Sequence, residues 1–148
     1  MARTLGYLLT WTTYGTWLQG DERGYVKDGE VLGANVAIKI DCRKNLKRAA
    51  VRLRRDERAV VREAILGARE KFDQKILAIA VCSNHVHVVC EYVDVPIGVV
   101  VSYYKNAGRM ALKTMGFRGR AWTKGYDKRF CFDEAALAER IRYVKGHD

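Results

Sequence analysis

The segment QKILAIAVCSNHVHVVCEYV, residues 74–93, limits the possible folds more than any other stretch of this 148-residue chain. Two apolar runs rich in β-branched residues flank a polar Ser-Asn pair, which predicts two neighbouring strands joined by a tight turn. Side chains alternate along a strand, so His85 and His87 should project side by side while Val86 and Val88 line the opposite face. Because two imidazoles lie on this strand face, the face is not expected to form a purely apolar core, and the histidines need another explanation.

The rest of the chain alternates helical and strand-like patterns, with no internal repeat and no domain boundary. The order of strand, helix, two strands, helix, strand and helix predicts an α+β fold, with helices packed on an antiparallel sheet. Residues 1–148 are therefore expected to form a single domain. The other expected elements are a strand ending near Gly15, a loop over 18–42 with a short strand at 36–40, helices over about 44–71 and from 94–98 onward, a strand at 129–132, and a helix over about 134–146 capped by Asp133.

Charge is the first indication of a partner. The net charge is +10, and residues 103–129 contain eight Lys or Arg but only one acid. Such a one-sided basic region favours nucleic acid, although a basic surface with no partner is the alternative. The predicted phosphate contacts are a helical ridge with residues four apart and two arginines in the glycine-rich loop that follows. They are Lys105, Arg109, Lys113, Arg118 and Arg120.

Location is constrained by what the sequence lacks. No apolar run approaches the roughly 20 residues needed to cross a bilayer, and the N-terminal stretch is too polar for a signal peptide. We therefore expect a cytoplasmic protein that does not enter the membrane. The four cysteines show no C-x-x-C pairing and are expected to be small buried apolar residues.

The histidine pair acquires further interest from the end of the chain. An H-x-H on a strand offers two nitrogen ligands for a divalent metal, but ordinary core or surface histidines are the simpler reading of the pair alone. Tyr143 and His147 are four residues apart, so they share one face of the last predicted helix. That helix must pack on the sheet, so His85, His87, His147 and Tyr143 can meet at one site.

These motifs together resemble those of the single-tyrosine HUH transposases, namely the IS200/IS605-like and REP-associated tyrosine transposases. The resemblance rests on four stretches and covers nearly the whole chain. Two departures stand out: Cys82 and Ser83 occupy positions where Met-Pro is common, and His147 replaces the more usual Gln or Asn. The stretches are LTWTTYGTWLQGDERGYV (9–26), SNHVHVV (83–89), AWTKGYDKRF (121–130) and RYVKGHD (142–148).

The resemblance implies a ferredoxin-like sheet and an enzyme that cleaves and rejoins single-stranded or hairpin DNA. Tyr143 would be the nucleophile and would form a 5′-phosphotyrosine intermediate. His85, His87 and His147 would bind Mg²⁺ or Mn²⁺. Asn84 would help to orient these histidines without binding the metal itself. A homodimer is expected because some relatives pair.

Two other functions stay open from the sequence alone. One is a DNA- or RNA-binding protein descended from a transposase that no longer cuts. The other is a metal-dependent hydrolase acting on a small substrate, which would need neither the high positive charge nor a tyrosine beside the metal. Among the other aromatic residues, Tyr103 and Tyr104 are expected to pack inside. Tyr14, Trp17, Trp122 and Tyr126 are candidates for stacking on bases, with packing equally plausible for Trp122.

Overall fold

A four-stranded antiparallel sheet forms the centre of the protein. The computed structural model describes residues 3–16, 25–27, 30–32 and 50–147. The strand order is β4-β5-β1-β6, which is the order of a ferredoxin-like sheet and confirms the predicted fold class. The strands that carry the two histidines and the N-terminal apolar run therefore lie in the middle. The strands are β1 (Gly6–Thr12), β4 (Ile76–Val81), β5 (His85–Glu91) and β6 (Asp127–Cys131).

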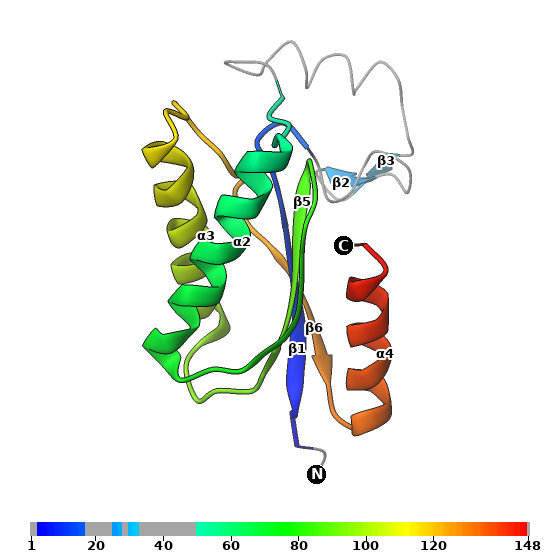
Figure 1. Ribbon diagram of the computed structural model, residues 1–148. Coiled ribbons are helices and arrows are strands. Elements are labelled where there is room, and N and C mark those ends of the chain that lie inside the picture. The colour runs from blue at the N-terminus through cyan, green and yellow to red at the C-terminus, as the bar shows by residue number, and fades with distance from the viewer. Residues whose placement is uncertain (1–2, 17–24, 28–29, 33–49, 148) are drawn as a thin grey trace.

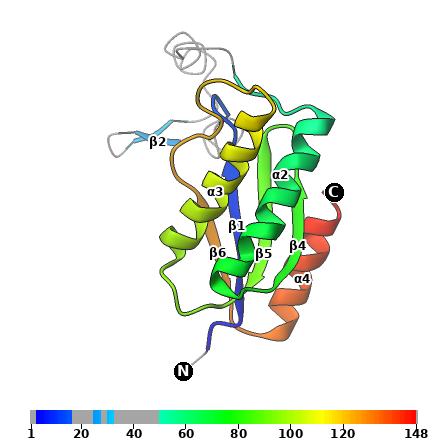
Figure 2. The ribbon, with the colours of Figure 1, turned by 60° about the vertical axis from the view of Figure 1, so that its left-hand side comes forward.

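Helices cover both faces of this sheet (Figure 1). The helices α2 and α3 lie side by side on one face, and α4 lies alone on the other, as the turned view also shows (Figure 2). None of the described helices is long and apolar enough to cross a membrane. The helical segments are α2 (Arg55–Ala68), the short 3₁₀ segment η1 (Arg69–Phe72), α3 (Ile97–Thr114) and α4 (Glu134–Lys145); a separate two-stranded sheet pairs β2 (Tyr25–Lys27) with β3 (Glu30–Leu32).

The alternation of β1 and β5 divides their side chains between two unequal cores. Tyr7 and Trp11 of β1, with Val88 of β5, belong to the large cluster beneath α2 and α3. Leu8 of β1 and Val89 of β5 belong to a smaller cluster beneath α4. The histidines share the α4 face with this smaller core, as the period-two pattern predicts.

The helix expected over 44–71 begins only at Arg55. Residues 50–54 are extended instead, because their buried backbone bonds to the sheet end: Val51 N–H donates to the Tyr14 carbonyl and Leu53 N–H to the Ser83 carbonyl. The prediction was wrong here because the helical spacing of apolar residues extends into residues 50–54, whose apolar side chains Val51 and Leu53 are buried against the sheet end and not as part of a helix. Residues 44–49, the predicted strand at 36–40, Trp17 and Cys42 lie outside the described residues.

The inner face of α3 also differs from the expectation. Tyr104 is fully buried, but Tyr103 is 40% exposed and packs against Phe72 with ring centroids 5.3 Å apart. Consecutive residues are about 100° apart on a helix, so the two tyrosines cannot both centre on the buried stripe. Gly108 lies where α3 closely approaches α2 and Trp122: a Cβ there would meet the Trp122 ring at 3.0 Å and Val61 Cγ1 at 3.2 Å.

Candidate active site

The floor of the site is a polar patch on the α4 face of the sheet. His85 and His87 project from β5, and the strand register places Thr12 opposite His85 and Thr10 opposite His87 on β1. Directly paired residues of antiparallel strands have Cβ atoms about 5 Å apart, so their side chains touch. Two threonines and two histidines therefore replace apolar residues at the end of the sheet where β5 begins.

Helix α4 brings the other side of the site. Asp133 caps its first turn by accepting a hydrogen bond from the Ala136 N–H at 2.7 Å, as predicted. Val144 is buried against the sheet, with Leu137 and Ile141 packed beside it. Tyr143 lies at the edge of this apolar stripe and is 48% exposed, so a large substrate can reach its ring.

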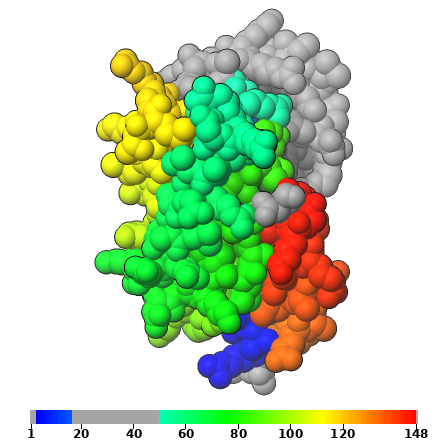
Figure 3. Space-filling model, viewed as in Figure 1, coloured from blue at the N-terminus to red at the C-terminus, as the bar shows by residue number. Residues whose placement is uncertain are grey.

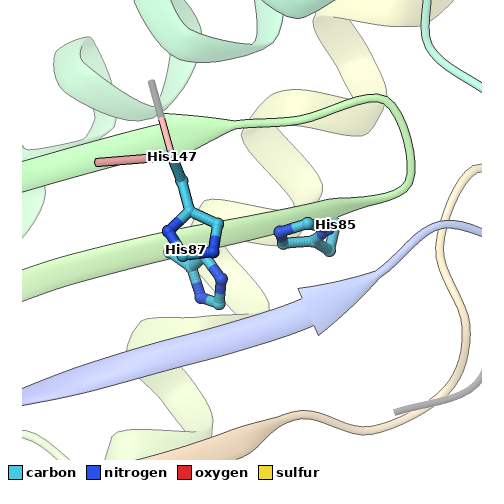
Figure 4. Close-up of side chains that lie close together, drawn as sticks. All are labelled: His85, His87 and His147. Atoms are coloured by element: carbon cyan, nitrogen blue, oxygen red, sulfur yellow. The ribbon is translucent and has the colours of Figure 1, made fainter. Parts of the chain in front are cut away.

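The three histidines come together although 60 residues separate His87 from His147 in sequence. Their candidate ligand atoms all lie within 4.8 Å of one another. His147 lies over His87 with ring centroids 4.9 Å apart, and His85 flanks both (Figure 4). The Tyr143 ring joins the cluster, with its centroid 4.5 Å from that of His147 and 5.5 Å from that of His87.

Each imidazole has its Nδ1 atom engaged by the protein. The Nδ1 of His85 donates to Asn84 Oδ1 at 2.7 Å, and that of His147 donates to the Tyr143 carbonyl at 2.8 Å. The Nδ1 of His87 lies 2.8 Å from Thr10 Oγ1, which can accept its proton. A proton on Nδ1 leaves the lone pair on Nε2, which is the arrangement found when a histidine binds a metal through Nε2.

Electrostatics keep the two strand histidines neutral. Burial lowers the pKa of His87 to about 4, and the neighbouring His85 and His147 add to the effect. Burial, followed by His147, also lowers the pKa of His85. Neutral imidazole is the metal-binding form, so protons compete weakly for these nitrogens at neutral pH.

The three histidines fit a cation on chemical grounds. Ions bound by histidine at about 2.1 Å hold their ligand nitrogens no more than about 4.2 Å apart, so small side-chain rotations would complete the site. The carbonyl end of α4 also points at this region and favours positive charge there. The described residues can therefore hold a metal ion, whose identity the donor set does not fix.

Among the other described tyrosines, Tyr104 is poorly placed to attack a substrate. It is fully buried, its hydroxyl donates a hydrogen bond to Gln74 Oε1, and burial raises its pKa. Tyr103 is exposed but lies on α3, on the opposite face of the sheet from the histidines. Of these three tyrosines, only Tyr143 contacts the histidine cluster.

The predicted phosphate contacts lie on α3 and the loop after it. Arg109 and Lys113 line one concave surface together with Arg118. Lys105 has a different environment, because its Nζ donates to the carbonyls of Thr123 and Gly125, both at 3.0 Å. Arg109 and Lys113 therefore line the concave surface, whereas Lys105 is bonded to the loop.

Near these residues, Arg120 lies over the Tyr14 ring at 5.5 Å and donates from Nε to the Trp122 carbonyl. Trp122 is 6% exposed and packs edge-on against Trp11, so packing is the correct reading of this residue.

Sequence reasoning missed Thr10. Its hydroxyl is buried and contacts the ring nitrogen of His87 across the β1–β5 pairing. A threonine within a TWTT run gives no signal of this role by itself. Knowledge of the strand register would have found it, because Thr10 is the residue directly opposite His87.

Comparison with solved structures shows that transposases share this fold. A REP-associated tyrosine transposase, solved bound to a REP hairpin, matches with a TM-score of 0.55 and 11% identity, over 97% of this chain and 67% of that chain. A candidate transposase of Deinococcus radiodurans R1 matches with a TM-score of 0.50 and 14% identity, over 99% of this chain and 93% of that chain. No family model and no curated protein matches the sequence. The predicted resemblance is confirmed in the fold and in the presence of the histidine cluster.

Proposed function

We propose that residues 1–148 form a single catalytic domain that cleaves and rejoins single-stranded DNA through Tyr143. The observation that carries this proposal is the contact of an accessible tyrosine with three clustered histidines. The transposase fold supports it, and so does the net charge of +10, which suits a polyanionic substrate.

In the proposed reaction Tyr143 Oη attacks the scissile phosphorus. The bond from phosphorus to the 3′ oxygen breaks, the 3′ oxygen ends as a hydroxyl, and the DNA 5′ end remains bonded to the tyrosine. The 3′-hydroxyl of another DNA end later attacks the phosphotyrosine, which restores the phosphodiester and the free tyrosine. The number of phosphoester bonds is unchanged, so no nucleotide cofactor is consumed.

His85, His87 and His147 would hold Mg²⁺ or Mn²⁺, with nitrogen ligands favouring Mn²⁺ in intrinsic affinity. The bound ion would polarise the phosphate and offset the charge that develops during attack. Asn84 and Thr10 would keep their histidines oriented through the Nδ1 contacts. The proposed substrate is single-stranded or hairpin DNA, as the hairpin bound to the structurally similar REP-associated transposase suggests.

The test is formation of a covalent protein–DNA adduct with Mn²⁺ and hairpin oligonucleotides that carry randomised single-stranded flanks. Label at the DNA 3′ end should remain with the denatured protein, whereas label at the 5′ end should be released. Tyr143→Phe removes only the hydroxyl and should abolish the adduct while preserving DNA binding. An adduct that persists in this variant would identify another nucleophile. DNA binding without any wild-type adduct would favour the non-cutting DNA-binding protein.

A further inference from the structure

Two concave surfaces adjoin Phe117, just after the end of α3. One cavity of about 480 Å³ is lined by Arg109, Lys113 and Arg118 together with Phe117. A second cavity, of about 570 Å³, is lined by Arg52 and Arg54, and again by Phe117. Gly116 and Phe117 line both cavities, so the two adjoin at this turn; together we call them the Phe117 groove.

The turn that presents Phe117 is well defined. Gly116 has φ of 90°, a conformation that favours glycine, and its N–H donates to the Lys113 carbonyl at 3.0 Å. Phe117 N–H donates to the Leu112 carbonyl at 3.1 Å. These bonds satisfy carbonyls at the end of α3 and fix the backbone at Phe117, whose side chain is half-buried against the core. An aromatic ring held in this way costs little entropy when it stacks on a ligand.

The charge around the groove is strongly positive. The first cavity has three cationic residues and no acid among its described lining residues. Among the described residues that line the second cavity, the one acid is Glu57, which is 7% exposed and accepts a hydrogen bond from the Arg54 backbone N–H. Its carboxylate also lies 3.4 Å from the Arg54 side chain. The exposed charge of the groove is therefore complementary to a polyanion.

We propose that the Phe117 groove binds an unpaired stretch of DNA, with a base stacked on Phe117 and neighbouring phosphates contacted by Arg52 and Lys113. An unpaired strand fits better than a duplex, because only unpaired bases expose their faces to an aromatic ring between two cavities. The inference deepens the proposed function and rests on it for the identity of the polyanion.

The groove is connected to the histidine site through backbone contacts. Arg52 and Arg54 flank Leu53, whose N–H donates to the Ser83 carbonyl at 2.7 Å. Asn84 follows directly and holds His85 through its side chain. The start of α2 and the end of α3 lie next to each other at this end of the molecule (Figure 3). The groove therefore adjoins the turn before β5, which leads directly to the histidines.

The binding test uses a fluorescein-labelled 15-nucleotide oligothymidylate in EDTA, so that no cleavage occurs. Phe117→Leu keeps an apolar side chain against the core but removes the stacking face, and should weaken binding about tenfold. Phe117→Trp should retain binding within about twofold. Equal affinity of the wild type and Phe117→Leu would overturn the inference, as would binding in the Trp variant as weak as in the Leu variant.

The phosphate contacts are tested by charge. Arg52→Gln combined with Lys113→Gln should lower the log–log salt slope by about 1.4, since each single-strand phosphate contact contributes about 0.7. Lys71→Gln combined with Lys75→Gln removes the same charge at exposed positions at the other end of α2 and should leave the slope unchanged. An equal decrease in both double variants would mean that binding depends on net charge, and the groove assignment would fail.

The location is tested by photocrosslinking with 5-iodouracil in the oligonucleotide, followed by mass spectrometry. The expected crosslink is at Phe117, and crosslinks confined to other peptides would contradict the proposal. Tighter binding of oligouridylate than of oligothymidylate would indicate that the ligand is RNA, and would also contradict the proposal. Failure of the catalytic proposal is a separate result: the wild type would form no adduct with Mn²⁺ while the binding pattern of the groove variants persisted.

Discussion

Replacement of Thr10 by Val tests whether the sheet beneath the histidines orients them for metal binding. The change keeps the shape of the side chain but removes the hydroxyl that lies 2.8 Å from His87 Nδ1. Thr10 is 7% exposed and so is His87, so water cannot readily replace the lost partner. In the tautomer with the proton on Nδ1, the ring then loses the acceptor of that proton.

The magnitude follows from this contact. A buried donor without a partner costs about 1–3 kcal/mol, although the ring can recover part of this by rotating. Loss of a residue that orients a metal ligand typically weakens metal affinity by about 10–100-fold, or about 1.4–2.8 kcal/mol. We expect Thr10→Val to weaken Mn²⁺ binding within that range and to lower the free energy of unfolding by about 1 kcal/mol.

The assay is calorimetric titration of the metal-free protein with Mn²⁺, combined with nitrogen-15 spectra of the imidazoles to identify the protonated nitrogen of His87. Thr10→Ser retains the hydroxyl and should restore most of the affinity. Thr12→Val is the matched control, because Thr12 lies on the same face of β1 but its hydroxyl donates to the Thr16 carbonyl. It should lower stability by a similar amount with little effect on the metal.

Two results would refute the reasoning about Thr10. One is unchanged Mn²⁺ affinity in Thr10→Val, which would mean that its hydroxyl does not orient the ligand. The other is an equal loss of affinity in Thr12→Val, which would reduce the effect to general damage to the sheet. An unaltered protonation pattern at His87 would argue against the mechanism even if affinity fell.

Further predictions concern pH, packing, ligand number and assembly. The His87 pKa of about 4 lies below its unfolded value near 6.5, so the unfolded state binds more protons than the folded state between these pH values. In urea unfolding, the free energy of unfolding of the metal-free protein should therefore fall by about 3 kcal/mol as the pH drops from 6.5 to 4. The decrease should be smaller in His87→Gln, which lacks this titrating group. Val144→Ala should cost about 2 kcal/mol in the same assay and weaken Mn²⁺ binding, because the packing of α4 positions His147 just after it. In calorimetry His147→Ala should weaken Mn²⁺ binding less than His87→Ala, since water can replace the exposed ligand more easily. Sedimentation should detect a homodimer at micromolar concentration, and a monomer alone would contradict it.

The sequence predicted the sheet well because its signals are local. Alternation along residues 85–91 assigns the two faces of β5, and the order of elements limits the topology to few choices. The Asp133 cap was predicted for the same reason, as it needs only the residues beside it. The predicted start of α2 was wrong because residues 50–54 are held against the sheet end by backbone hydrogen bonds. These bonds join segments far apart in sequence, so no local pattern predicts them.

The candidate site was only partly predictable. Spacing of two on a strand and four on a helix correctly grouped its members in two pairs, and the packing of α4 on the sheet brought those pairs together. Thr10 escaped notice because its role depends on strand register, and Phe117 because its importance depends on two concave surfaces meeting there. Lys105 has the spacing of a ridge residue, yet its ammonium group is bonded to loop carbonyls.

The position of the histidines carries a structural cost that bears on mechanism. The apolar cluster beneath α4 is small, and at the end where β5 begins the sheet offers threonine and histidine instead of apolar side chains. The last turn of α4 is attached to the sheet through the buried Val144, and the residues just after it through the ring contacts of His147 and the contact of the Cys82 thiol with the His147 carbonyl. Under the proposed function, a ligand shared by β5 and His147 would fasten this turn to the sheet. Tyr143 lies one turn earlier on the same face, so filling the histidine site would also fix the nucleophile above it. Under the proposed function, the spacing of four residues would thus couple the position of the attacking oxygen to occupancy of the site.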